Sequence, residues 1–340
     1  MKAVTIAGFG GPEQVELAEL GEPEPGPGEV VVRIEAAALN HLDLWTIGGL
    51  VRDLPLPHVL GADGAGVIEA TGPGCRLRAG ARVLINPALS CGACERCRAG
   101  EQSECSSFAM LGEHRHGTFA EYVAVPERNC FPYPNHLTPE QAAALGTTFI
   151  TAYRMLFGRG RLSPGEWLLV TGIGGGLALS ALQLARPVAG RVFVTSSSDA
   201  KLERARALGA DHGLNYRNDD VGVAVRRLTG TRGVDLALDS AGGAALDGCL
   251  RALRKGGRLV IAGATAGPEP TVNLRRVFWN QLSIVGSTMG SDAEVSDMLR
   301  AVAGMKLEPV IDSTYGFSEA RAALERLASG EHFGKIVLVP

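Results

Sequence analysis

The order of hydrophobic and polar positions divides the chain into a first part rich in short strands and a second part in which strands and helices alternate. Residues 29–35 alternate as a half-buried strand does, after a turn rich in Pro and Gly at residues 22–28. From residue 167 onward, apolar runs alternate with helical patterns, one of which covers residues 201–208 and ends at Gly209. The predicted strands of this second part are residues 167–170, 191–195, 212–216, 234–239, 258–262 and 282–286. Six strands with helices between most of them predict a doubly wound parallel sheet.

A glycine-rich turn follows the first of these strands and precedes a helical stretch at residues 179–184. A strand that leads through such a turn into a helix places unpaired N–H groups and the positive end of the helix dipole at one point, which favours a bound phosphate. Ala178 stands at the last small position, where helix packs against strand, and we expect its methyl group to be tolerated. The residues assigned to a dinucleotide pyrophosphate are Gly172, Gly174, Gly175, Gly176 and Leu177.

The end of the second strand indicates which dinucleotide binds. Sites for NAD usually carry an acidic residue about 20 positions after the first glycine, where it accepts hydrogen bonds from the ribose. Here the strand ends in Ser196 and Ser197, which tolerate a 2′-phosphate, and Lys201 can neutralise that phosphate. Asp199 comes late for a ribose ligand and is interpreted as a helix N-cap. The sequence therefore favours NADP(H) over NAD(H).

Four cysteines, Cys91, Cys94, Cys97 and Cys105, are crowded into one loop with almost no apolar residues. Their spacing allows four thiolates to close a tetrahedron around one Zn²⁺, and such a site stabilises the loop without leaving a position for substrate. Disulfides or free thiols are the alternatives. A second pair of candidate ligands, His114 and His116, is interpreted as exposed histidines of a turn.

Composition narrows the class of protein further. With 340 residues, the chain is expected to form two domains. Its net charge of −3 does not favour a nucleic acid or an anionic membrane surface, so a small-molecule substrate is expected. No stretch approaches the roughly 18 apolar residues of a membrane helix, and there is no signal-like apolar segment, so we expect a cytoplasmic protein.

The succession of a β-rich part, a four-cysteine loop and a dinucleotide-binding part resembles the medium-chain dehydrogenase/reductases over essentially the whole chain. Segments 40–43, 61–66, 112–114, 215–216 and 286–290 resemble the quinone oxidoreductase-like branch that keeps a zinc-binding loop. The resemblance implies an α/β fold with a GroES-like, β-rich catalytic domain at residues 1–148, which contains the structural-zinc loop 91–105. It implies a Rossmann domain with a six-stranded parallel sheet at 149–287 and a return to the catalytic domain at 288–340. A homodimer joined near residues 282–289, or a tetramer, is also implied.

The resemblance assigns further residues to the cofactor. Lys201 and Tyr216 match the Lys and Tyr that hold the 2′-phosphate in quinone oxidoreductases of this kind. The remaining cofactor positions implied are Thr151, Ser196, Ser197, Ser240, Gly263, Ala264, Thr265, Ser287, Thr288 and Lys335.

The positions that bind the catalytic metal in zinc alcohol dehydrogenases differ in this chain. They are Asn40, Ala62 and Thr147 here, and the Ser or Thr of the proton relay is Leu42. Chemistry that depends on a metal to polarise a C–O bond would then lack its Lewis acid. The function expected is NADPH-dependent hydride transfer to a quinone or an α,β-unsaturated carbonyl.

The catalytic residues predicted for this reaction are Asn40, His41, Trp45 and Thr147. Asn40 would hydrogen-bond the substrate carbonyl, Trp45 would line an apolar pocket, and solvent or His41 would supply a proton. The resemblance gives His41 a competing role facing the cofactor phosphates, and leaves Asp63 with structural hydrogen bonds.

Two alternatives remain open. One is a zinc-dependent alcohol dehydrogenase or carbonyl reductase with a relocated second metal held by His41, Asp43 or His114. The other is a redox-silent binding or structural homologue.

Overall fold

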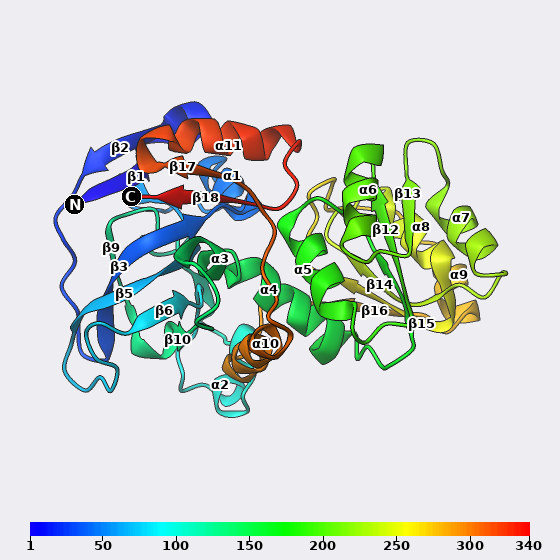
Figure 1. Ribbon diagram of the computed structural model, residues 1–340, viewed down its shortest axis with the longest axis horizontal. Helices are drawn as coiled ribbons and strands as arrows, with labels where there is room; N and C mark the ends of the chain where they lie inside the picture. The colour runs from blue at the N-terminus through cyan, green and yellow to red at the C-terminus, as the bar shows by residue number, and fades with distance from the viewer. The chain divides into compact units, whose positions relative to one another are not determined.

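The computed structural model describes residues 1–340 and divides into two compact units. The first comprises residues 1–150 and 290–340, and the second comprises residues 151–289 (Figure 1). Each unit has its own hydrophobic core. None of the helices is long and apolar enough to cross a bilayer.

The first unit is built on a seven-stranded sheet. Its strands are β3 (Glu29–Ala38), β5 (Asp63–Thr71), β6 (Arg82–Ile85), β9 (Tyr122–Pro126), β10 (Cys130–Pro132), β17 (Ile311–Gly316) and β18 (Lys335–Val339). Their order is β10-β6-β5-β3-β18-β17, with β9 also paired to β3. Gly66 lets β5 lie close to β3, because a Cβ atom there would lie 2.0 Å from the carbonyl oxygen of Arg33.

The central strand β3 explains how the sheet positions the polar residues described below. It pairs with β5 along most of its length, and its last residues pair with β18, so that Ala38 lies opposite both Asp63 and Val337. The beginning of β5, the end of β3 and the beginning of β18 therefore meet. Asp63, Asn40 and Lys335 lie at this point, although they are far apart in the sequence.

Smaller elements complete the first unit. Its other strands are β1 (Lys2–Ile6), β2 (Val15–Glu19) and β4 (His58–Val59), which form a three-stranded sheet, and β7 (Ala88–Leu89) and β8 (Ala109–Met110), which form a pair. Its helices are α1 (His41–Ile47), α2 (Glu95–Arg98), α3 (Pro139–Ala143), α10 (Asp292–Met305) and α11 (Ala320–Ser329). Helix α4 (Gly146–Tyr153) carries the chain from the first unit into the second.

The second unit is a six-stranded parallel sheet flanked by helices (Figure 1). Its strands are β11 (Trp167–Val170), β12 (Arg191–Ser196), β13 (His212–Asn215), β14 (Val234–Asp239), β15 (Leu253–Ile261) and β16 (Ser283–Gly286). Its helices are α5 (Gly176–Ala185), α6 (Asp199–Ala207), α7 (Val221–Leu228), α8 (Ala245–Ala252) and α9 (Leu274–Trp279), after a π-helical turn at Arg154–Arg159. The order β13-β12-β11-β14-β15-β16 puts the first strand in the middle, with the chain reversing direction across the sheet there. The predicted fold class is confirmed.

One local prediction is wrong. Helix α6 is capped by Ser198, whose hydroxyl accepts from the N–H of Lys201, and not by Asp199. Asp199 lies in the first helical turn and accepts a hydrogen bond from the side-chain amide of Asn215 at 2.8 Å. Both residue types cap helices well, so a sequence with the two side by side does not distinguish them.

Candidate functional site

The first unit contains a buried polar cluster of Leu39, Asn40, Asp63, Thr147 and Lys335, called the Lys335 cluster below. The Lys335 ammonium donates to the carbonyl oxygen of Leu39 at 2.7 Å, to Asn40 Oδ1 at 2.7 Å and to Asp63 Oδ2 at 3.0 Å. The Lys335 and Asp63 side chains are only 4% and 0% exposed. An ammonium group has three protons, and here each has an acceptor.

Asp63 is the second centre of this cluster. Its Oδ1 atom accepts from the N–H of Thr147 at 2.6 Å and from the Thr147 hydroxyl at 2.7 Å, while its Oδ2 atom accepts from Asn40 Nδ2 at 2.9 Å. Gly146 makes room for this arrangement, because a Cβ atom there would lie 2.3 Å from Asp63 Oδ1. The carboxylate is thus fully paired and hydrogen-bonded, as a buried charge must be.

Local structure fixes the Asn40 side chain. Asn40 precedes α1, and its N–H donates to Asp43 Oδ2 at 2.7 Å in a capping arrangement. Its Oδ1 is held by Lys335 and one Nδ2 proton by Asp63, while the other Nδ2 contact, to the carbonyl of Ala38, is long at 3.4 Å. The second amide proton is therefore held less firmly than the first.

His41 and Trp45 lie on α1 beside this cluster. The ring centroid of His41 is 6.4 Å from that of Trp45 and 6.4 Å from that of His332. Burial and the nearby Lys335 charge lower the pKa of His41, which favours its neutral form. Trp45 is 41% exposed and so leaves an apolar surface open next to polar groups.

The residues at the expected catalytic-metal positions do not fit a metal ion. Ala62 is buried and has no ligand atom, and Asn40 and Thr147 hydrogen-bond to Lys335 and Asp63. The alternative ligands His41, Asp43 and His114 form no group of metal-binding side chains; the one group of three or more in the chain is the four cysteines. His114 and His116 are exposed, and their Nδ1 atoms accept backbone N–H groups.

The four cysteines fit a structural zinc ion. The sulfur atoms of Cys91, Cys94, Cys97 and Cys105 lie within 4.8 Å of one another. Backbone N–H groups of Ala93 and Cys94 donate to the Cys91 sulfur and lower its pKa, which favours the thiolate that a metal requires. The set is closed, with no side chain left for substrate chemistry.

In the second unit, the glycine turn has the geometry expected for a pyrophosphate. Gly172 and Gly174 have φ angles of +68° and +119°, which favour glycine, and α5 begins at Gly176. Lys201 lies across the turn, because a Cβ atom at Gly174 would be 2.7 Å from its Cδ and 3.3 Å from its Nζ. Backbone N–H groups at the start of α5 and this ammonium thus gather at one point.

Thr151 lies in α4, and the other predicted cofactor residues of this unit lie at the ends of its strands or on the loops that follow them. The carbonyl of Ser240 accepts from the N–H of Thr265, and Gly263 lies so close that a Cβ atom there would be 2.6 Å from that carbonyl oxygen. The hydroxyl of Ser287 is buried without a hydrogen-bond partner, so it fits a ligand that the chain itself does not supply. Tyr216 lies just beyond β13 and is 53% exposed.

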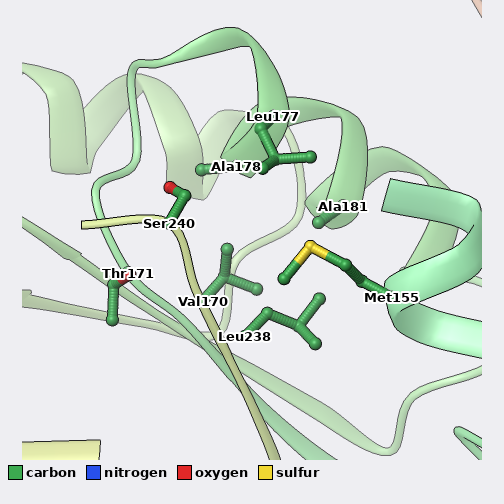
Figure 2. Close-up of a pocket in the computed structure, with 8 residues that line it drawn as sticks. All are labelled: Met155, Val170, Thr171, Leu177, Ala178, Ala181, Leu238 and Ser240. Carbon is green, nitrogen blue, oxygen red and sulfur yellow. The ribbon is translucent and has the colours of Figure 1, made fainter. Parts of the chain in front are cut away.

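A small pocket lies below the glycine turn. Figure 2 shows Thr171 and Ser240 on one side of it and Met155 on the other, with Ala178 and Ala181 of α5 above Val170. Ala178 is 3% exposed, so its methyl group is accommodated between helix and strand.

Comparison with known proteins places the chain in a family. Residues 26–135 match the family described as alcohol dehydrogenase GroES-like domain, and residues 176–304 match the zinc-binding dehydrogenases. The NAD-dependent alcohol dehydrogenase of Saccharolobus solfataricus is 32% identical, with all of both chains covered. The chain is a medium-chain dehydrogenase/reductase.

Solved structures agree with this assignment and confirm the predicted family. The crystal structure of an NAD-dependent alcohol dehydrogenase has a TM-score of 0.96 and 48% identity over all of both chains. A crotonyl-CoA carboxylase/reductase variant in complex with NADP has a TM-score of 0.93 and 26% identity, over 100% of this chain and 94% of the other. This medium-chain dehydrogenase/reductase is therefore an oxidoreductase.

Sequence reasoning brought some site residues together and missed others. Asn40 and Thr147 both hydrogen-bond to Asp63, and their catalytic roles stay predictions. The structure adds Lys335 to them, which was predicted among the cofactor residues. Its cofactor role stays a prediction, since the ammonium already has three acceptors within the first unit. The position of Lys335 in this cluster was missed because it depends on the pairing of β18 with β3, which no local pattern specifies.

We expect the substitution Cys97→Ser to lower the zinc content of the purified protein from one ion per chain to well below one. The variant removes one of four thiolates from a closed site, and the loop should lose thermal stability with the metal. Elemental analysis and a thermal melt measure both effects. Cys75→Ser, at an isolated, half-buried thiol, is the control and should keep its zinc. Full zinc content in Cys97→Ser would contradict the assignment.

We expect Asp43→Asn to become more stable relative to the unchanged protein as the pH rises from 5 to 8. Burial raises the pKa of Asp43 to about 7, against the hydrogen bond from Asn40 and the charge of Lys335. Between the pKa of Asp43 in the unfolded chain and this value, the folded protein binds one proton more than the unfolded chain does. The free energy of unfolding of the unchanged protein therefore falls as the pH rises through this range. Asparagine does not titrate. Denaturant unfolding at several pH values measures the difference, with the exposed Asp53→Asn as control; a difference independent of pH would contradict the burial effect.

Proposed function

We propose that this protein transfers a hydride from NADPH to a quinone or an α,β-unsaturated carbonyl compound without a catalytic metal. The observation that carries the proposal is the Lys335 cluster. Of the residues at the catalytic-metal positions, Asn40 accepts from the Lys335 ammonium and Thr147 donates to its partner Asp63, and this ammonium has its three acceptors in place. The negative charge of Asp63 is therefore balanced by Lys335. The residues at the catalytic-metal positions leave no set of ligand atoms for a Lewis acid.

The residues of the chain suit a conjugated acceptor. When bound, the nicotinamide supplies the hydride. In a conjugated acceptor the negative charge develops on an oxygen remote from the carbon that receives the hydride, so one well-placed N–H donor stabilises it. The weakly used Nδ2 proton of Asn40 is that donor in our proposal, with Lys335 and Asp63 fixing the amide orientation. Trp45 offers the apolar surface, and solvent supplies the proton, either directly or through the imidazole of His41, which takes a proton from water at one ring nitrogen as it gives one up at the other.

A zinc-dependent alcohol dehydrogenase is the second candidate, because relatives are named alcohol dehydrogenase and because the chain matches the zinc-binding dehydrogenase family. The crotonyl-CoA carboxylase/reductase supports the first candidate, since crotonyl-CoA names a conjugated thioester. We favour the first candidate because Ala62 carries no ligand atom and because Asn40 and Thr147 hydrogen-bond to Lys335 and Asp63.

The proposal is tested by counting metal and assaying both reactions on the same preparation. We expect one zinc per chain, and NADPH-dependent reduction of a benzoquinone or an α,β-unsaturated ketone. Oxidation of primary and secondary alcohols, with NAD⁺ or NADP⁺, should be slower or absent. Two zinc ions per chain together with alcohol oxidation would establish the second candidate. Tight NADPH binding with no turnover of any of these substrates would indicate a redox-silent homologue.

For the cofactor we propose NADP(H), held at its 2′-phosphate by Lys201, Tyr216 and the serines that end β12. Relatives are divided on this point, since one is described as NAD-dependent and another is bound to NADP. The absence of a carboxylate at Ser196 and Ser197 and the cation nearby favour the phosphorylated dinucleotide.

We expect Lys201→Ala to raise the KM for NADPH about tenfold and to leave the KM for NADH nearly unchanged. A charge-assisted hydrogen bond to a phosphate contributes about 1.5–3 kcal/mol, and only NADPH has the 2′-phosphate. Steady-state kinetics with both cofactors measure the effect, and Lys255→Ala, at an exposed lysine of the same unit, is the control. An equal loss with both cofactors would instead place the ammonium on the pyrophosphate, which its position over Gly174 would allow.

The proposed partner is a second copy of the chain. Strand β16 is an edge strand with Ile284 42% exposed, and α9 leaves Leu274, Phe278 and Trp279 exposed. An edge strand next to exposed large apolar side chains favours association. We therefore propose a homodimer through this edge, with a tetramer as the larger alternative.

A further inference from the structure

Asp239, at the end of β14, is a buried carboxylate that none of the roles above uses. It is 0% exposed and accepts three hydrogen bonds. The Thr171 hydroxyl donates to its Oδ1 atom at 2.6 Å, the Ala241 N–H to Oδ1 at 3.1 Å and the Gly242 N–H to Oδ2 at 2.9 Å. The three donors come from two different loops at the carboxyl end of the sheet.

Each of these loops contains predicted cofactor residues. Thr171 directly precedes Gly172, the first residue of the glycine turn. Ala241 and Gly242 follow Ser240, and Gly242 and Gly243 both have positive φ angles, of +68° and +50°. The carboxylate therefore ties the phosphate-binding turn after β11 to the loop after β14.

The loop after β14 is in turn hydrogen-bonded to the loop after β15. The N–H of Ala266 donates to the carbonyl of Ala241 at 2.7 Å, and the N–H of Gly243 donates to the carbonyl of Gly267 at 3.0 Å. The N–H of Ala262 donates to the carbonyl of Asp239 itself at 3.0 Å. The Asp239 side chain thus joins the loops after β11 and β14, which flank the topological switch point of the sheet, and backbone hydrogen bonds join the loop after β15 to them.

We propose that Asp239 is a positioning residue of the dinucleotide site, which holds the loops after β11, β14 and β15 in their binding arrangement before the cofactor arrives. This inference rests on the proposal that the second unit binds a nicotinamide dinucleotide, and not on the identity of the substrate. A carboxylate suits the task because it accepts on both oxygens, and all three of its partners are donors. Loops that are already ordered lose less entropy when the ligand binds.

The same strand offers a matched control. Asp235, at the other end of β14, is also buried and accepts from the N–H of Trp167 at 2.8 Å and from Arg232 and Arg254. Burial opposes its ionisation, but these hydrogen bonds and the Arg232 charge lower the pKa of Asp235. Asp235 lies near the amino end of β14, whereas the glycine turn lies at the carboxyl ends of the strands. If Asp239 only stabilised the fold, replacing either aspartate should therefore have the same kind of effect on stability and on binding.

The experiment compares Asp239→Asn with Asp235→Asn in the full chain. In Asp239→Asn one oxygen becomes an NH₂ group, so either the N–H of Gly242 or the two donors on Oδ1 lose their acceptor. We expect the Kd for NADPH and for NADH, from fluorescence titration without substrate, to rise about tenfold or more. We expect the KM for the dinucleotide to rise with it while kcat changes less. Asp235→Asn should lower the melting temperature and leave both Kd values within about twofold of the unchanged protein.

Thr171→Val keeps the experiment decisive if Asp239→Asn does not fold. It removes one donor and leaves the carboxylate in place, and we expect Kd to rise a few-fold. The proposal is overturned if folded Asp239→Asn binds both dinucleotides as tightly as the unchanged protein. It is also overturned if Asp235→Asn weakens binding as much, or if Thr171→Val has no effect when it is the only folded variant. An unchanged protein that binds neither NADH nor NADPH would instead refute the dinucleotide proposal itself.

Discussion

The buried ion pair between Lys335 and Asp63 is the interaction on which the first unit depends. Removing one partner of such a pair leaves the other charge buried and unpaired, at a cost of about 3–5 kcal/mol. Here the pair is tolerated because the other protons of the ammonium and the other lone pairs of the carboxylate have partners in Asn40, Thr147 or the carbonyl of Leu39. It connects the start of β18 to the end of β3 and the start of β5, and through Thr147 to α4. The same contacts that hold these elements together orient the amide that we propose meets the substrate.

The second unit uses a buried carboxylate in a different way. Asp63 is paired with a lysine, whereas Asp239 accepts from a hydroxyl and two backbone N–H groups and has no cation among these donors. Hydrogen bonds to backbone N–H groups fix loop conformation, which a flexible lysine does less well. In our proposals the two units thus use buried acids for two purposes, since Asp63 orients the amide of Asn40 and Asp239 orders the loops that we assign to the dinucleotide.

Local patterns predicted the parts of the fold that depend on local physics. The strand ending at Val170, the turn with Gly172 and Gly174 and the helix after it form a contiguous unit, so both the turn and the order of the sheet follow from the sequence. The four cysteines were recognisable for the same reason, because their ligand atoms are close in the sequence. Lys335 could not be placed in this way, since its contact with Leu39 joins residues 296 positions apart. The N-cap of α6 was predicted wrongly because Ser198 and Asp199 are adjacent and both residue types suit that position.

The place of β18 in the first sheet has a consequence for how the protein is made. A ribosome synthesises Asn40 and Asp63 early, and Lys335 only after the whole of the second unit has been made. Until then the Asp63 carboxylate has no Lys335 ammonium beside it, and the last residues of β3 lack their pairing with β18. The second unit is continuous in the sequence, so all its strands have been made before that point. It can then fold, because domains generally fold as units once their residues are available. The unit that begins first along the chain is therefore the last to be completed, and during synthesis it is the part with an open sheet edge and an uncompensated acid.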